Sequence, residues 1–218
     1  MGGFEVIEAA RKRSPYTELL VITGHTEHEL LDRVARAAVS FITKPVIHRE
    51  LVLAATSMIN AWQARFTTLL TVLNGFSELL PILQDRGHNK PPFRIVDEYD
   101  LQDLLHFLFK PLFRDVIVEE YTLKRAGKTK RLDLVLKGLE AVVETKMVRT
   151  KAHSRKISDE LDIDIRGYVS HPYCRRLICF VYDPKHYLKD PRTIEKDLSG
   201  DQSQDRSVIE VSVMVRPT

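Results

Sequence analysis

The segment from Arg131 to Lys146, RLDLVLKGLEAVVETK, limits the fold of this chain more than any other part of it. Two runs of alternating apolar and polar residues flank Gly138 and Leu139, which predicts a β-hairpin with a two-residue, Gly-first turn. A turn at that point places Asp133 opposite Glu144, with Cβ atoms about 5 Å apart. Lys146 lies on the same face, because strand side chains alternate with period two.

The other face of this hairpin is apolar and suited to packing against helices. It carries Leu132, Leu134, Leu136, Ala141, Val143 and Met147. The three polar groups therefore gather on one face of a sheet that has a core on the other.

Two carboxylates held this close repel each other, and a divalent cation relieves the repulsion. We expect Mg²⁺, with Mn²⁺ as a substitute, to take one oxygen from each of Asp133 and Glu144, and the carbonyl of Thr145. Lys146 can orient or deprotonate a water and offset negative charge on a phosphorane. Such a set predicts a phosphodiesterase, and the alternative is acidic and basic decoration of an exposed strand.

The hairpin resembles the PD-(D/E)XK nuclease superfamily, whose signature is an Asp on one strand and (D/E)-x-K on the next. Asp133, Glu144 and Lys146 match it in order and spacing, with Leu132 in place of the nominal Pro. The resemblance extends over about residues 88 to 218 and is to the DpnII/MboI-like restriction endonuclease domain. It is carried by FRIVDEYDLQDLLHFLFKPLFRDVIVEEYT, RLDLVLKGLEAVVETKMVR and ELDIDIRGYVSHPYCRRLICFVYDP.

This resemblance implies an α/β fold with a mixed sheet flanked by helices, and a Mg²⁺-dependent endonuclease that hydrolyses DNA. It also implies a further catalytic carboxylate from a helix before the hairpin, which we assign to Glu98, with Gln102 one turn later on the same face. The alternative for Glu98 is an acid favoured by the helix dipole.

The remaining segments of this region alternate between helix and strand patterns. They predict helices at 96–109 and 157–170, and strands at 116–122, 176–182 and 208–216. Basic residues concentrate between Lys124 and Lys156, although the whole chain has a net charge of only +3. We expect a phosphate backbone to bind there, and the residues assigned to it are Lys128, Lys130, Arg131, Arg149 and Lys151.

Residues 1–65 predict a separate unit of helix 4–13, strand 19–23, helix 27–38, strand 40–43 and a helix from Arg49. The unit resembles the C-terminal half of a response-regulator receiver domain, which is flavodoxin-like. The matching residues are Thr23, at the phosphate-sensing position, Phe41, at the aromatic switch position, and Lys44 before a proline that is usually cis.

The acidic pair and the phosphoacceptor Asp of receivers would precede this segment. Phosphorylation in the usual way is therefore not expected, and Met1 is either an internal start or the beginning of a half-receiver kept for assembly. Two strands with helices would leave apolar surface and a sheet edge uncovered. We expect a homodimer. The expected role of this unit is dimerisation, or regulation by an upstream signalling partner.

Apolar residues recur at helical spacing from Arg49 to Asp85, which predicts one or two long helices with a kink or final turn at Pro81. Residues 66–87 are the predicted linker, and GHNKPP at 87–92 marks the boundary before the nuclease-like region at 88–218. No uncharged apolar run is long enough to cross a membrane.

Two cysteines, Cys174 and Cys179, indicate reduced thiols and a cytoplasmic protein rather than a disulfide framework. The eight histidines show no zinc-ligand spacing with them. Two alternatives to a DNA nuclease stay open: an RNA nuclease, and a protein of nuclease fold that binds nucleic acid or a signalling partner without cutting.

Overall fold

The structure is a computed structural model that describes residues 3–13, 17–24, 40–121, 131–169, 171, 174–204 and 207–217. The chain divides into two compact units, Met1–Thr68 and Leu69–Thr218. The predicted linker at 66–87 is largely helical, and its Leu69, Leu73 and Phe76 are fully buried. The predicted domain boundaries stay a prediction.

The first unit contains a helix and a two-stranded parallel sheet. Helix α1 (Gly3–Arg13) places Ile7 against Phe4, Leu19 and Val21. Strands β1 (Leu20–Thr23) and β2 (Ser40–Thr43) pair in parallel register, with Thr23 beside Thr43. The predicted helix and strands agree with these elements, whereas the helix predicted at 27–38 lies outside the described residues.

The receiver-like residues lie at the ends of these two strands. Thr23 is buried, Phe41 is 39% exposed, and Lys44 is exposed at the surface. The Lys44 amide donates to the Thr23 carbonyl at 2.7 Å, which joins the two strand ends. The Lys44-Pro45 peptide bond is cis.

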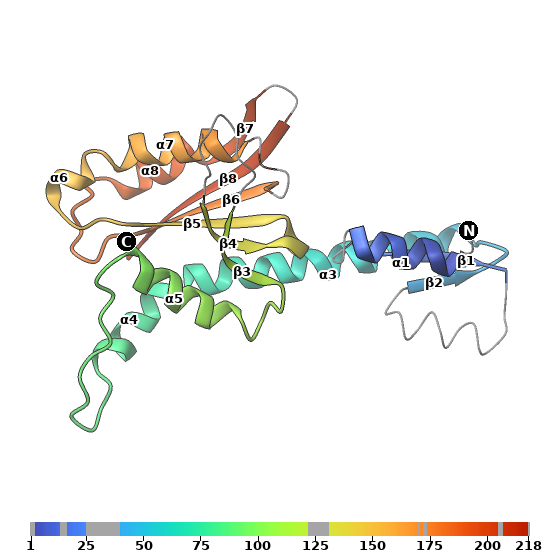
Figure 1. The fold of residues 1–218 in the computed structure, drawn as a ribbon, viewed down its shortest axis with the longest axis horizontal. Helices are drawn as coiled ribbons and strands as arrows, with labels where there is room; N and C mark the ends of the chain where they lie inside the picture. The colour runs from blue at the N-terminus through green and yellow to red at the C-terminus, as the bar shows by residue number, and fades with distance from the viewer. Residues whose placement is uncertain are drawn as a thin grey trace. The chain divides into compact units, whose positions relative to one another are not determined.

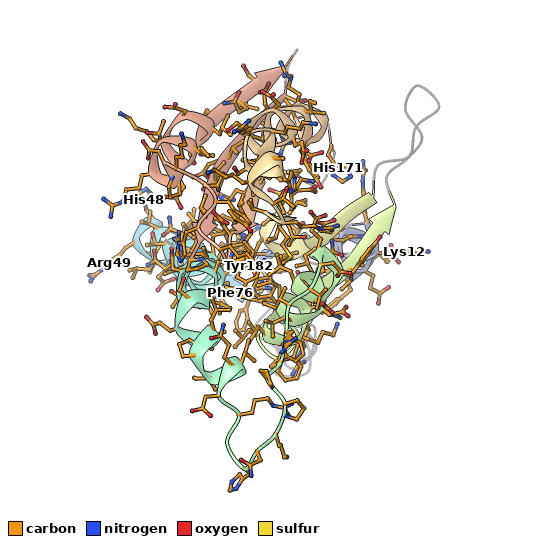
Figure 2. The ribbon with its side chains drawn as sticks, turned by 90° about the vertical axis from the view of Figure 1, so that its left-hand side faces the viewer. Lys12, His48, Arg49, Phe76, His171 and Tyr182 are labelled. Carbon is orange, nitrogen blue, oxygen red and sulfur yellow. The ribbon has the colours of Figure 1, made fainter. Side chains whose placement is uncertain are left out.

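The long helical segment breaks at Gly75 and not at Pro81. Helix α3 (His48–Asn74) and helix α4 (Phe76–Gln84) meet at an angle of 45°, and Pro81 lies inside α4. Glycine has a low helix propensity, and a Cβ here would approach the Thr71 carbonyl at 3.3 Å. The bend directs Phe76 edge-on against Phe180 and Tyr182, at ring distances of 5.1 and 5.7 Å. Figure 2 shows Phe76 and Tyr182 side by side.

Neither α3 nor any other single described helix is long and apolar enough to cross a membrane. Helices α3 and α4 meet that criterion only when they are taken together across their bend.

The second unit is a six-stranded mixed sheet in the order β3-β4-β5-β6-β8-β7. Its strands are β3 (Val116–Tyr121), β4 (Arg131–Leu136), β5 (Ala141–Met147), β6 (Arg176–Tyr182), β7 (Gly200–Gln204) and β8 (Ser207–Arg216). Its further helices are α5 (Glu98–Phe109), α6 (Lys151–Ser154), α7 (Ile157–Tyr168) and α8 (Pro191–Leu198). This arrangement confirms the predicted mixed sheet flanked by helices.

Helices cover both faces of this sheet (Figure 1). Helices α7 and α8 pack on one face over Val135, Val142 and Leu177, while α4 and α5 lie on the other. Strands β5 and β6 are parallel, and the crossover between them carries α6 and α7. This crossover places α7 over the face of β5 that carries Glu144 and Lys146.

Candidate active site

The hairpin of β4 and β5 has the predicted register, with Leu134 opposite Val143 and Leu136 opposite Ala141. Its turn differs from the prediction. Residues Lys137–Leu139 form a 3₁₀ turn, and Glu140 follows with φ +48°. The Asp115 carboxylate holds the turn by accepting from the Gly138 amide at 2.7 Å. Because this longer loop has the same centre as a turn at Gly138 and Leu139, the pairing is unchanged.

The pairing of β4 with β5 runs from the turn to Leu134 and Val143. One position farther from the turn, at Asp133, the two strands diverge. The Asp133 Oδ2 atom takes the place of a backbone partner, accepting from the Thr145 amide at 2.8 Å and from its hydroxyl at 2.7 Å. Gln102, buried on α5, donates to the same hydroxyl at 3.2 Å. A buried polar chain therefore fixes one oxygen of Asp133, and its other oxygen accepts no hydrogen bond from the described residues.

Glu144 is 5% exposed and lies on the α7 face of β5. The Tyr168 hydroxyl donates to its Oε2 atom, and the Lys146 ammonium lies 3.0 Å from its Oε1 atom. Burial, and then the nearby charge of Asp133, raise the pKa of Glu144 from 4.5 to about 7, although Lys146 opposes the shift. A neutral carboxyl and a carboxylate are thus both accessible near neutral pH.

Lys146 forms a second ion pair with Asp164, at 2.8 Å. Burial by itself lowers the pKa of Lys146, but attraction by Glu144 and Asp164 outweighs it and raises the pKa above its ordinary value. With these neighbours Lys146 stays protonated. It is therefore better suited to orienting a water and offsetting negative charge than to removing a proton.

Two residues of this cluster were not predicted from the sequence, Asp164 and Tyr168 on α7. They are four residues apart, so both side chains lie on one helix face, next to the buried Leu161 and Ile165. A sequence signal for them exists. In a helix that connects two parallel strands, polar side chains next to the apolar stripe are the ones that can contact the sheet. Burial and the charge of Glu144 raise the pKa of Tyr168, which keeps it a hydrogen-bond donor.

Glu98 lies at the first position of α5, which Asp97 caps by accepting from the amides of Tyr99 and Asp100. The Glu98 Oε1 atom accepts from the Met147 amide at 3.3 Å, one residue beyond Lys146. The structure thus brings Glu98 to the same end of β5 as the hairpin residues. Its catalytic role stays a prediction.

A family model described as a DpnII-MboI restriction endonuclease (REase) matches residues 67–218. The chain belongs to this family. The match covers most of the chain and the whole six-stranded sheet, and the fold is restriction-endonuclease-like as expected. No curated protein and no solved structure is significantly similar to the chain. Membership of the DpnII-MboI family makes the chain a DNA-cleaving hydrolase by class.

The donor set of this DpnII-MboI member fits a small divalent cation. Glu144 and Asp164 pair with the Lys146 ammonium, and the charge of Asp133 acts on Glu144, so the site carries excess negative charge when all three carboxylates ionise. No group of three or more His, Cys, Asp or Glu side chains in the described part of the chain is spaced to hold a metal. Mg²⁺ needs fewer, because it keeps several waters and takes one or two carboxylates.

Of the basic residues assigned to DNA, the structure describes two fully. Arg149 and Lys151 are exposed just after β5, which ends one residue beyond Lys146. The side chain of Arg131 lies outside the described residues, as do Lys128 and Lys130. Arg149 and Lys151 thus follow the end of β5 at which Lys146 lies.

Asp164→Asn is expected to lower the DNA cleavage rate about 10- to 100-fold, as for partners that orient a catalytic group. Because the charge of Asp164 helps to raise the pKa of Glu144, its loss should also move the acid limb of the pH–rate profile to lower pH. The profile is measured with plasmid DNA between pH 5 and 9.

Asp162→Asn is the matched control, since Asp162 lies on the same helix but pairs with Arg166 at the surface. Its rate and pH profile should equal those of the wild type. If Asp164→Asn and Asp162→Asn had the same cleavage rate and pH profile, Asp164 would have no role in cleavage.

Proposed function

We propose that the chain is a Mg²⁺-dependent PD-(D/E)XK endodeoxyribonuclease in which Asp133, Glu144 and Lys146 carry the chemistry. The observation behind this proposal is the convergence of Asp133, Glu144 and Lys146 at the point where β4 and β5 separate. A binding protein has no need to bury a glutamate of raised pKa against a lysine. The family match supports DNA as substrate.

Asp133, Glu144 and the Thr145 carbonyl are the residues proposed to hold the metal. When bound, Mg²⁺ lowers the pKa of water and stabilises the leaving oxygen. Asp133 presents its unbonded oxygen, because Thr145 holds the other one. Glu144 must lose its proton to act as a ligand, and Lys146, kept charged by Asp164, orients the water and offsets charge on the phosphoryl group.

Glu98 is proposed as a further carboxylate at this end of β5, because it already contacts the Met147 amide. Lys128, Lys130, Arg131, Arg149 and Lys151 are proposed to bind the phosphate backbone. Their role is orientation and salt-dependent affinity, not sequence recognition.

The test is incubation of the purified full chain with methylated and unmethylated plasmid DNA in Mg²⁺ or Mn²⁺, with Lys146→Ala and chelator controls. Cleavage abolished by both controls is the expected result. Absence of cleavage with intact metal binding would favour an RNA substrate or a missing activator. Absence of both would favour the non-catalytic binding protein.

We further propose that the receiver-like residues 1–65 mediate self-association, as the resemblance to half a receiver implies, with regulation by a signalling partner as a further role. Several apolar side chains of this unit are more than half exposed, including Ile47, Leu53 and Ile59. Exposed apolar side chains favour a partner where they form a contiguous patch.

Light scattering of the full chain at tens of micromolar is expected to give twice the chain mass of 25.1 kDa. Leu53→Glu together with Ile59→Glu should return a monomer, because charges at an apolar interface are costly to bury. A monomeric mass for the unmodified chain would rule out the dimer.

A further inference from the structure

A pocket of about 560 Å³ lies in the second unit between α4, the segment before α5, and the ends of β5 and β6. This volume is within the range of small-molecule sites. Met147 lines it and directly follows Lys146, but its side chain lies on the opposite face of the sheet, away from α7. The pocket is therefore adjacent to the candidate active site and distinct from it.

The walls of the pocket are held in place by hydrogen bonds. The Phe93 amide donates to the Leu83 carbonyl at 2.9 Å, which ties the segment before α5 to α4. The Val148 amide donates to the Tyr182 carbonyl at 2.8 Å. Asp183 is 2% exposed, and its carboxylate accepts from the amides of Tyr187 and Leu188, which fixes the loop that carries Lys185. A preformed pocket spares a ligand the cost of ordering it.

The charge of the lining is one-sided. Arg94, Arg149 and Lys185 are its basic residues, and none of its described lining residues is acidic. The charged groups of these three side chains form no hydrogen bond or ion pair with the described residues. The nearby Asp183 is committed to two backbone amides. Unpaired cations around a concave surface attract an anion.

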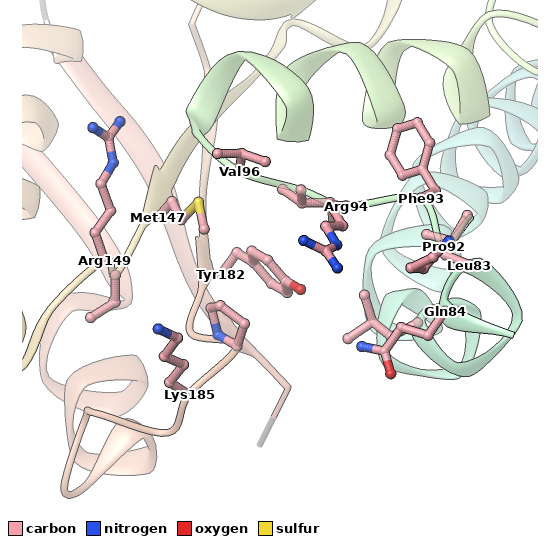
Figure 3. A pocket seen from close by; sticks show the side chains of 14 residues that line it. Leu83, Gln84, Pro92, Phe93, Arg94, Val96, Met147, Arg149, Tyr182 and Lys185 are labelled. Carbon is pink, nitrogen blue, oxygen red and sulfur yellow. The ribbon is translucent and has the colours of Figure 1, made fainter.

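The floor of the pocket is apolar and aromatic. Phe93, Met147, Tyr182 and Pro184 line it, and Phe93 is 41% exposed. In Figure 3 the Arg94 guanidinium and the Tyr182 hydroxyl lie toward each other, whereas the Arg149 guanidinium points away from them and Lys185 stands on the other side of Tyr182 from Arg94. Guanidinium groups bind phosphate oxygens in pairs, and aromatic rings stack on planar bases.

We propose that this pocket binds a nucleoside phosphate, with the phosphate on Arg94 and Lys185 and the base against Phe93 and Met147. Two sources share this chemistry, a free mononucleotide and a nucleotide of the strand that crosses the active site. The second source rests on the proposed nuclease function, whereas the first does not.

Methyl NMR of the full chain labelled at methionine tests the proposal. The chain has four methionines, and of these Met147 lines the pocket while Met58 and Met214 do not. Met147→Leu assigns the signal. Titration with each 5′-deoxymononucleotide in a chelator is expected to shift the Met147 methyl signal alone, and to do so at concentrations at least tenfold lower than inorganic phosphate.

Arg94→Gln and Lys185→Gln are each expected to weaken nucleotide binding about tenfold, the scale of one charged hydrogen bond. Phe93→Ala should reduce nucleotide affinity to that of phosphate. Lys196→Gln is the matched control, because this exposed lysine on α8 loses the same charge away from the pocket. An unmoved Met147 signal, an equal response to phosphate, or unchanged affinity in both charge variants would overturn the proposal.

A short single-stranded oligonucleotide separates the two sources. If it shifts Met147 at lower concentration than the mononucleotides, the ligand is part of the strand; if only mononucleotides act, the ligand is a free nucleotide. Both results support the site. The chelator prevents cleavage, so nucleotide binding is measured separately from nuclease activity. Nucleotide binding without nuclease activity in Mg²⁺ would contradict the nuclease proposal alone. DNA cleavage without nucleotide binding to the pocket would contradict the pocket proposal alone.

Discussion

Asp133→Asn is expected to reduce plasmid cleavage at least about a thousandfold, the scale of a lost electrostatic group in an active site. The asparagine carbonyl can still accept from the Thr145 amide and hydroxyl, so the junction of β4 and β5 should keep its geometry. What disappears is the negative charge on the oxygen that is free to bind a metal. Calorimetric titration should therefore show Mg²⁺ or Mn²⁺ affinity lost in the variant.

Asp103→Asn provides the matched control, because Asp103 is an exposed acid on α5. It should cleave DNA and bind metal as the wild type does. Circular dichroism of Asp133→Asn should match the wild type. Unchanged metal affinity in Asp133→Asn would remove Asp133 from the metal site, whatever happens to the cleavage rate.

Glu144→Gln is expected to abolish cleavage and, in a chelator at pH 8, to increase the free energy of unfolding of the second unit by about 1–3 kcal/mol. The folded pKa of Glu144, about 7, lies above its ordinary value of 4.5. Between these values the folded state holds the proton more tightly, so stability falls as pH rises through this window. Glutamine carries no charge, so the variant should not lose stability as pH rises through this window.

The unfolding measurement must follow the second unit. The one tryptophan, Trp62, lies in the first unit, whereas six of the seven tyrosines follow residue 68. Near-ultraviolet circular dichroism of tyrosine in urea, at pH 5 and pH 8, is therefore the suitable probe. At pH 5 the variant and wild type should be almost equally stable. A variant that is less stable than the wild type at pH 8 would contradict the cost assigned to the Glu144 carboxylate.

A residue kept for function rather than for stability should lose activity and gain stability when it is replaced, as expected for Glu144→Gln. A buried ion pair kept for stability would lose stability when one partner is neutralised. Glu144 has Tyr168, Lys146 and two further carboxylates around it, and the sum of these interactions still leaves its pKa raised.

The hairpin could be predicted from the sequence because two local properties determine it. Side chains alternate with period two, and the centre of the turn fixes every pair, so Leu134 and Val143 had to face each other. The type of turn could not be predicted in the same way. It depends on Asp115, a residue more than twenty positions earlier that binds the Gly138 amide.

Asp164 and Tyr168 escaped prediction because their position depends on how α7 is rotated over the sheet. The helix itself follows from the spacing of Ile157, Leu161 and Ile165. Which polar neighbours of that stripe reach β5 is decided by packing between segments far apart in the chain. Gln102 was placed correctly on the face of Glu98, but its contact with Thr145 is equally a tertiary result.

Two of the elements that were not predicted, α8 and β7, have weak local patterns. β7 reads GDQSQ, with no apolar alternation, and it forms a strand because β8 offers a free edge. Helix α8 is only eight residues long and begins with a proline behind the Asp190 cap. In contrast, β6 and β8 are apolar and β-branched, and both were predicted to within one residue.

The hydrogen bond from Tyr168 to Glu144 places an ultraviolet-absorbing phenol in contact with a carboxyl group of the candidate active site. Absorption by a phenol depends on whether its hydroxyl donates to a carboxylate or to a neutral carboxyl group. Tyr168 is fully buried, so solvent does not compete for this contact. If Glu144 loses its proton or binds a cation as proposed, an ultraviolet difference spectrum should report the change through Tyr168, and Tyr168→Phe should remove that part of the signal.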